Sequence, residues 1–221
     1  MTKFHVPDRH VGALKYLASV DATGFEGLLS ALSNEPASSR AQLETRVGQV
    51  LPASDVGFKT PLVGAILSLC VVRSSNEAKP DGFATELAAA EELEFNAEER
   101  KTFEERLMQV LSLGPLTNLA KAANLIAENA NLFGEARVIT DIRPVFADDP
   151  ATTPTGAVIM HTLKVDYYSD EDFRADFFVL DDVDLVKLRK AIDRAIEKSE
   201  SLQALLSSAG LAAMQPMREE E

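Results

Sequence analysis

The sequence predicts an α+β protein: an all-helical N-terminal domain followed by a small three-stranded antiparallel sheet and a long C-terminal amphipathic helix. Three observations predict this. Apolar residues recur at helical spacing from Val11 to Phe133, the period changes to two after Gly134, and Ala157–Leu206 is typical of two strands followed by a helix. We expect a helical domain at 1–134 and a sheet-and-helix domain at 135–221.

Several short helices are expected in the N-terminal domain. Apolar stripes predict helices over 11–17, 25–32, 43–51 and 83–93. The run LVGAILSLCVV begins after Thr60-Pro61, a pair typical of a helix start. Because this run is apolar nearly all round, it predicts the buried central helix of the domain.

Two further helices are expected to close the helical domain. Asn96 and Glu99 have the spacing of a capping box, which predicts that a helix begins there. Gly114-Pro115 breaks that helix. The last helix is expected from Leu116 to Phe133, with Gly134 ending it as a left-handed cap.

The following segment predicts a first strand over Val138–Phe146 and then a hairpin. If Tyr167 pairs with Phe173, both polar-face pairs on the hairpin join opposite charges. The same register places the apolar residues of both strands on one face. The pairs in question are Asp166 with Arg174 and Lys164 with Asp176, and the apolar set is Ile159, Leu163, Val165, Phe173, Ala175, Phe177 and Val179.

The C-terminal helix begins with Asp181, Asp182 and Asp184, where the helix dipole favours acidic residues. A helix of some twenty residues is about 30 Å long, more than strands of eight residues can cover. Part of its apolar stripe is therefore expected to contact something else, and a second copy of the chain is the natural candidate. The expected interface comprises Ile159, His161, Leu163, Val165, Phe177, Val179, Leu188, Ile192, Ile196 and Leu202.

Composition limits the partners. The net charge of −13 argues against nucleic acid and against an anionic membrane surface, because both need clustered Lys and Arg. Cys70 is the single cysteine, so no internal disulfide forms. The N-terminus lacks an apolar signal region, and the run Leu62–Val72 is short for a membrane span. We expect a cytoplasmic protein that binds neither nucleic acid nor membrane.

No residue pattern indicates catalysis, a cofactor or a metal. His161 lies among apolar neighbours, which is more typical of a hydrogen-bonded core or interface group than of a ligand. The acidic runs near Asp148, Asp170 and Asp181 lack the ligand spacing of a calcium loop. Phosphate-binding glycine loops, nucleophile elbows and zinc-protease motifs are all absent from the sequence.

The segment RADFFVLDDVDLVKLRKAIDRAIEKSESLQALL, together with Asp141-Ile142-Arg143, resembles the COMM-domain proteins. The match covers roughly Arg137 to Leu206, and Ile142 stands where that family often has tryptophan. The resemblance implies an obligate dimer or higher assembly through interlocked C-terminal domains. It also implies a scaffold or adaptor role without catalytic residues.

Three functions remain open from the sequence. The first is a non-enzymatic interaction or scaffold protein that self-associates through the residues after Gly134. The second is a small-molecule-binding or enzymatic α+β protein with a site between its two halves. The third is an acidic regulator that covers a basic surface of a partner.

Overall fold

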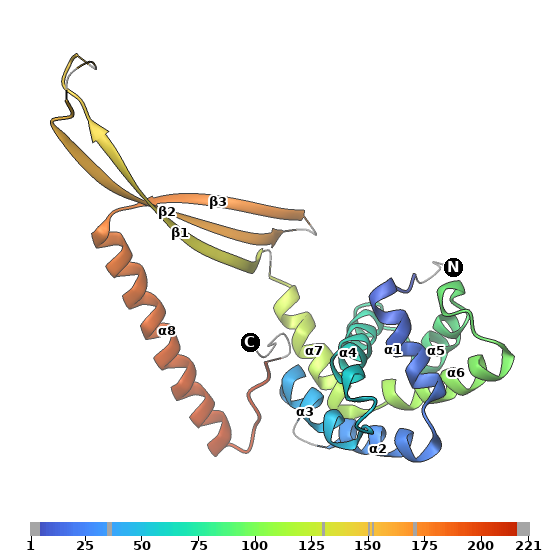
Figure 1. The fold of residues 1–221 in the computed structure, drawn as a ribbon. Helices are drawn as coiled ribbons and strands as arrows, with labels where there is room; N and C mark the ends of the chain where they lie inside the picture. The colour runs from blue at the N-terminus through green and yellow to red at the C-terminus, as the bar shows by residue number, and fades with distance from the viewer. Residues whose placement is uncertain are drawn as a thin grey trace. The chain divides into compact units, whose positions relative to one another are not determined.

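The computed structural model describes residues 5–34, 37–129, 131–149, 151, 153–169 and 172–215 (Figure 1). The chain forms two compact units. One comprises Met1–Ile126 together with Ala212–Glu221, and the other comprises Ala127–Leu211. The first unit is helical, and the second holds a three-stranded antiparallel sheet and the last long helix. The predicted α+β class is confirmed.

The helical unit is built from seven α-helices and two short 3₁₀ turns in its described part. Residues 212–215 also belong to this unit, in which the Gln215 amide donates to the Ser38 carbonyl at 2.6 Å. The elements are α1 (Asp8–Ser19), α2 (Ala22–Ser33), α3 (Arg40–Val50), η1 (Val56–Phe58), α4 (Lys59–Ser75), α5 (Pro80–Ala88), η2 (Glu91–Leu93), α6 (Ala97–Leu111) and α7 (Gly114–Ala127).

Helix α4 is the buried helix that the sequence predicts. Its residues Leu62, Val63, Ala65, Ile66 and Cys70 are fully buried, and α1, α3 and α6 pack against it. Together with η1 it forms the one segment of the described chain that is long and apolar enough to cross a membrane. The buried core helix of a globular protein can have the same length and composition, so this property is weak evidence for a membrane span.

Helix α6 begins with the predicted capping box. The Asn96 side chain accepts from the Glu98 and Glu99 amides at 2.9 Å, and the Glu99 carboxylate accepts from the Asn96 amide at 3.0 Å. These bonds satisfy amide groups that have no partner within the helix. The opening of α6 was therefore predictable from two residues three positions apart.

Replacing Asn96 with alanine is expected to lower the free energy of unfolding by about 1 kcal/mol, because two helix amides lose their acceptor. Urea denaturation followed by circular dichroism measures the change. Asn118→Ala is the matched control, since Asn118 lies exposed within α7, where alanine favours the helix. Equal losses in both variants would contradict the role of the cap.

The predicted last helix of the N-terminal half is too long. Helix α7 ends at Ala127, and strand β1 (Asn131–Val145) already contains Phe133 and Gly134. The pairing register shifts between Phe133 and Glu135, so Gly134 forms a bulge in β1 rather than a helix cap. A Cβ atom at this glycine would lie 3.1 Å from the Asp166 carbonyl oxygen, which explains why glycine suits the position.

Strand β2 (Gly156–Ser169) is the centre of the sheet, with β1 and β3 (Asp172–Leu180) on either side (Figure 1). The strand order is β1-β2-β3, and both pairings are antiparallel. Strand β1 pairs with the whole length of β2, whereas β3 pairs only with His161–Ser169. The part of β1 and β2 nearer residue 150 is therefore a two-stranded arm.

The predicted hairpin register is wrong by one residue. Tyr168, and not Tyr167, lies opposite Phe173, and Ser169 pairs with Asp172. This register leaves two residues between the paired ends, the commonest hairpin connection, and it places the Tyr168 and Phe173 rings edge to face at 5.6 Å. Exposed ion pairs contribute less than about 1 kcal/mol each, so the predicted charge pairs do not decide the register.

Helix α8 (Asp182–Ser208) is the longest element of the described chain, with 27 residues. It begins with a second capping box, in which the Asp181 carboxylate accepts from the Asp184 amide at 2.8 Å. The pKa of Asp184 is lowered, first by the hydrogen bond from Lys187 and next by the Asp181 amide. Gly210, with φ of +71°, ends the helix in the left-handed conformation.

Candidate assembly surface

The unit Ala127–Leu211 contains no buried apolar side chain among its described residues. Every buried apolar residue of the described chain lies between Val6 and Ala123, in the helical unit. The buried side chains of the second unit are His161, Asp166 and Ser169, which are all polar. Because apolar burial is the main favourable contribution to folding, a sheet and helix without a core need cover from elsewhere.

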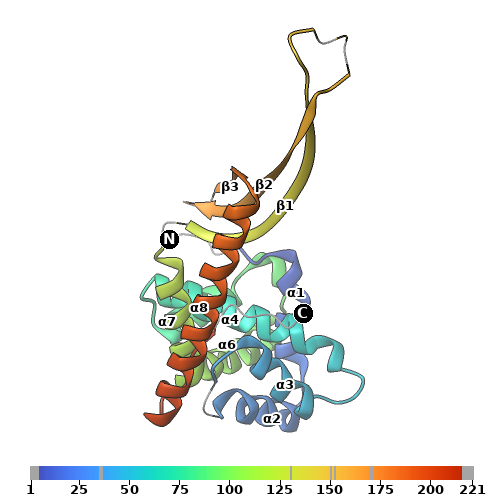
Figure 2. The ribbon, with the colours of Figure 1, turned by 90° about the vertical axis from the view of Figure 1, so that its left-hand side faces the viewer.

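Helix α8 leaves the sheet at its first turn and does not lie along either face (Figures 1 and 2). None of its 27 residues is buried. In the first two turns Asp184, Leu185 and Leu188 are half-buried, and beyond them every apolar side chain except the half-buried Leu206 is exposed. A sheet and a neighbouring helix normally pack face to face as two layers. In a single copy of this chain, the sheet and α8 do not pack in this way.

The two faces of the sheet differ in polarity. Directly paired residues on neighbouring strands point to the same face, so the register assigns each side chain. The first face, the Leu163 face, is mainly apolar: it carries Val138, Ile142, Ile159, Leu163, Val165, Phe178 and Leu180, with the charged Arg174 and Asp176 at its β3 end. The second, the Phe177 face, mixes apolar and charged residues: Arg137, Ile139, Asp141, Lys164, Asp166, Phe173, Phe177 and Val179.

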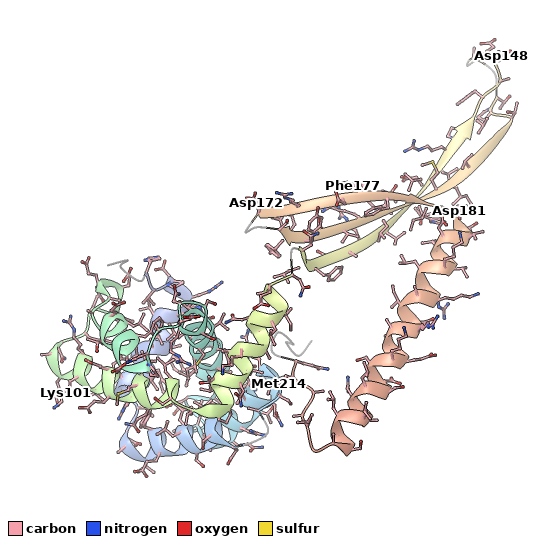
Figure 3. The ribbon with its side chains drawn as sticks, turned by 180° about the vertical axis from the view of Figure 1, so that it is seen from behind. Lys101, Asp148, Asp172, Phe177, Asp181 and Met214 are labelled. Carbon is pink, nitrogen blue, oxygen red and sulfur yellow. The ribbon has the colours of Figure 1, made fainter. Side chains whose placement is uncertain are left out.

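The register divides the expected interface residues of the sheet between these two faces. Ile159, His161, Leu163 and Val165 lie on the Leu163 face as expected. Phe177 and Val179 lie on the opposite face, because the one-residue shift turns every β3 side chain over. Figure 3 marks Phe177 on β3 and Asp181 at the start of α8. The prediction that both apolar sets share one face is thus wrong.

The expected interface residues of α8 do lie on one side of the helix. Leu188, Ile192, Ile196 and Leu202 recur at spacings of four, four and six residues, and Leu185 and Leu206 extend the same stripe. Ile192, Ile196 and Leu202 each expose more than half of their surface. An apolar stripe of this length on a helix about 40 Å long is a large surface to leave in water.

His161 joins the sheet to the start of α8. Its Nε2 lies 3.0 Å from the Asp182 carboxylate, its Nδ1 lies 2.9 Å from the Thr140 hydroxyl, and the residue as a whole is 8% exposed. The histidine therefore has a partner on β1 and another on α8, as the sequence interpretation of a hydrogen-bonded group expects. It fixes the point at which α8 departs from the Leu163 face.

The charge of α8 differs from that of the whole chain. Its residues include five basic side chains and five acidic ones, so the helix is neutral within a chain of net charge −13. A neutral helix would therefore add little electrostatic repulsion to a contact with another acidic surface. The basic residues are Lys187, Arg189, Lys190, Arg194 and Lys198, and the acidic ones are Asp182, Asp184, Asp193, Glu197 and Glu200.

Two titratable groups of the described chain have pKa values that burial raises strongly. Burial raises the pKa of the Cys70 thiol to about 12, so this cysteine is a poor nucleophile at neutral pH. Burial and a hydrogen bond to Asp55 raise the pKa of Tyr16 to about 12. Among the described residues, no three His, Cys, Asp or Glu side chains are grouped to hold a metal ion.

Part of the candidate surface was missed from the sequence. Strand β1 contributes Val138 and Ile142 to the Leu163 face, and β3 contributes Phe178. The alternation of Val138, Thr140 and Ile142 in β1 could have identified the first two. Phe178 could not be placed, because only the register decides which of two adjacent phenylalanines faces which side. No family model matches the chain, and a search of curated proteins found no match.

Proposed function

We propose that this protein is a non-enzymatic interaction or scaffold protein that self-associates through the unit Ala127–Leu211. One observation carries the proposal. This unit exposes an apolar sheet face and an apolar helix stripe, and no apolar residue in its described part is buried. Surfaces of this kind are typical of obligate interfaces, which resemble a domain core divided between two chains.

A second copy of the chain is the partner that these surfaces fit. Within the described residues of this unit, no helix covers the Leu163 face and no sheet face covers the α8 stripe, so each copy can supply what the other needs. If α8 of one copy lies on the Leu163 face of the next, two-fold symmetry satisfies both surfaces twice in a closed dimer. The neutral charge of α8 favours this contact in an otherwise acidic chain.

The resemblance to COMM-domain proteins supports the same proposal, since it implies interlocked C-terminal domains and a scaffold role. We also propose that the protein is cytoplasmic, which rests on its acidic composition and single buried cysteine. The helical unit, with a core of its own, is then the part that the assembly presents to further proteins.

Sedimentation equilibrium of the purified chain at several micromolar concentrations tests self-association. We expect a mass that is a multiple of 24.0 kDa and that persists on dilution, because a shared core gives a tight interface. Co-expression of two differently tagged copies should yield a species that carries both tags. A strict monomer throughout the concentration series would overturn the proposal.

A further inference from the structure

Helix α8 carries a second surface that the proposed assembly does not use. Lys187, Lys190, Arg194 and Lys198 follow one another at spacings of three, four and four residues. Side chains three or four residues apart lie on the same side of a helix, so these four residues form one line, the α8 basic row. At the rise of an α-helix the row is about 16 Å long.

The row lies away from the apolar stripe of the same helix. Each residue turns an α-helix by about 100°, which places Arg194 roughly opposite Ile192 and Ile196. All four basic residues of the row are exposed. Cover of the stripe by a second copy therefore leaves the row accessible, and the row does not depend on the proposed self-association.

Three cations of the row have no carboxylate partner among the described residues. Lys187 is paired, because its Nζ lies 3.1 Å from the Asp184 carboxylate. No ion pair of Lys190, Arg194 or Lys198 is found in the part of the chain that the structure describes. The greater part of the row is therefore positive charge that is left to water or to a partner.

The row destabilises α8 in the single chain. Lys190 and Arg194 are like charges four residues apart, and so are Arg194 and Lys198. Like charges at this spacing repel each other along a helix. An anionic partner that lies along the row replaces this repulsion with attraction, so its binding also stabilises the helix.

The surroundings of the row favour an acidic protein helix over other polyanions. Helix α8 is neutral, so the rest of the chain carries the whole net charge of −13. A nucleic acid or an anionic membrane needs a broader basic surface, and it would be repelled by the acidic residues of the sheet. These residues include Glu135, Asp141, Asp172 and Asp176. A single helix with carboxylates three or four residues apart meets only the row.

We propose that the α8 basic row binds an acidic α-helix of a partner protein, whose carboxylates pair with Lys190, Arg194 and Lys198. Each exposed ion pair is weak alone, and several pairs along one line give the contact its strength. The matching spacing of the charges gives the contact its specificity for a helix. The partner is held on the side of α8 that the proposed self-association leaves open.

Fluorescence anisotropy of a labelled helical peptide, titrated with the full chain, tests the row. The probe is an alanine-rich peptide with glutamate at every fourth residue, and the same peptide with glutamine at those positions is the neutral control. We expect saturable binding of the glutamate peptide that weakens as the NaCl concentration rises. The glutamine peptide should bind at least tenfold more weakly.

Paired substitutions locate the binding site. Lys190→Glu with Arg194→Glu should weaken binding of the glutamate peptide at least tenfold. Lys190→Gln with Arg194→Gln removes the two charges without adding new ones, and it should weaken binding by a smaller factor. Lys79→Glu with Lys121→Glu is the matched control, because it changes the net charge as much as the first pair, at exposed residues of the helical unit. This control should leave the affinity unchanged.

Sedimentation equilibrium separates this proposal from self-association. Lys190→Glu with Arg194→Glu should keep the mass of the unchanged chain, because the row lies away from the apolar stripe. An unchanged chain that is monomeric but binds the glutamate peptide would contradict self-association alone. Equal binding of the two peptides, or an equal loss in the Lys79 and Lys121 control, would overturn the role of the row. So would tighter binding of single-stranded oligothymidylate or of phosphatidylserine vesicles than of the glutamate peptide.

Discussion

Replacing Ile196 with aspartate is expected to convert the associated protein into a monomer. Ile196 lies in the middle of the α8 stripe and is 54% exposed in the single chain. In the proposed dimer this side chain is covered by the Leu163 face of the partner, so the variant would bury an unpaired carboxylate. A buried charge without a partner costs about 3 kcal/mol or more, which weakens association more than a hundredfold.

Ser201→Asp is the matched control for this change. It adds the same charge to the same helix, but Ser201 lies on the side of α8 away from the stripe, near Lys198 and Arg194. We expect it to leave the mass in sedimentation equilibrium unchanged. If both variants dissociate to the same extent, added negative charge rather than loss of the apolar stripe explains the effect, and α8 is not the interface.

The elements of this protein were largely predictable, because each depends on local spacing. The capping box of Asn96 and Glu99, the buried run of α4 and the apolar stripe of α8 all follow from residues a few positions apart. The bulge at Gly134 was not predictable, because a glycine near a helix end and a glycine in a bulged strand have the same local sequence pattern. Only its closeness to the Asp166 carbonyl distinguishes them.

The candidate surface was predictable only in part, because its composition depends on long-range pairing. The α8 residues follow from helical periodicity alone, and they lie on one side as expected. The β3 residues required the hairpin register, and two weak charge pairs were outweighed by a short connection and the Tyr168–Phe173 contact.

Phenylalanine-to-alanine substitutions in the two units should have different effects on the stability of the helical unit. Phe103 of α6 is fully buried and its ring lies 5.0 Å from that of Phe95, so Phe103→Ala leaves a cavity in a well-packed core. We expect the free energy of unfolding of the helical unit to fall by about 3–5 kcal/mol. Urea denaturation followed by hydrogen exchange of the α4 and α6 amides measures this loss.

Phe177→Ala is the comparison for that result, because it makes the same chemical change at a residue of β3 that is 61% exposed. In a single copy of the chain this exposed side chain makes few packing contacts, and it lies outside the helical unit. The free energy of unfolding of the helical unit should therefore not change. Slower exchange of the sheet amides with rising protein concentration would show that the second unit gains its cover from another copy. A large loss of helical-unit stability in Phe177→Ala would instead mean that the two units share one core.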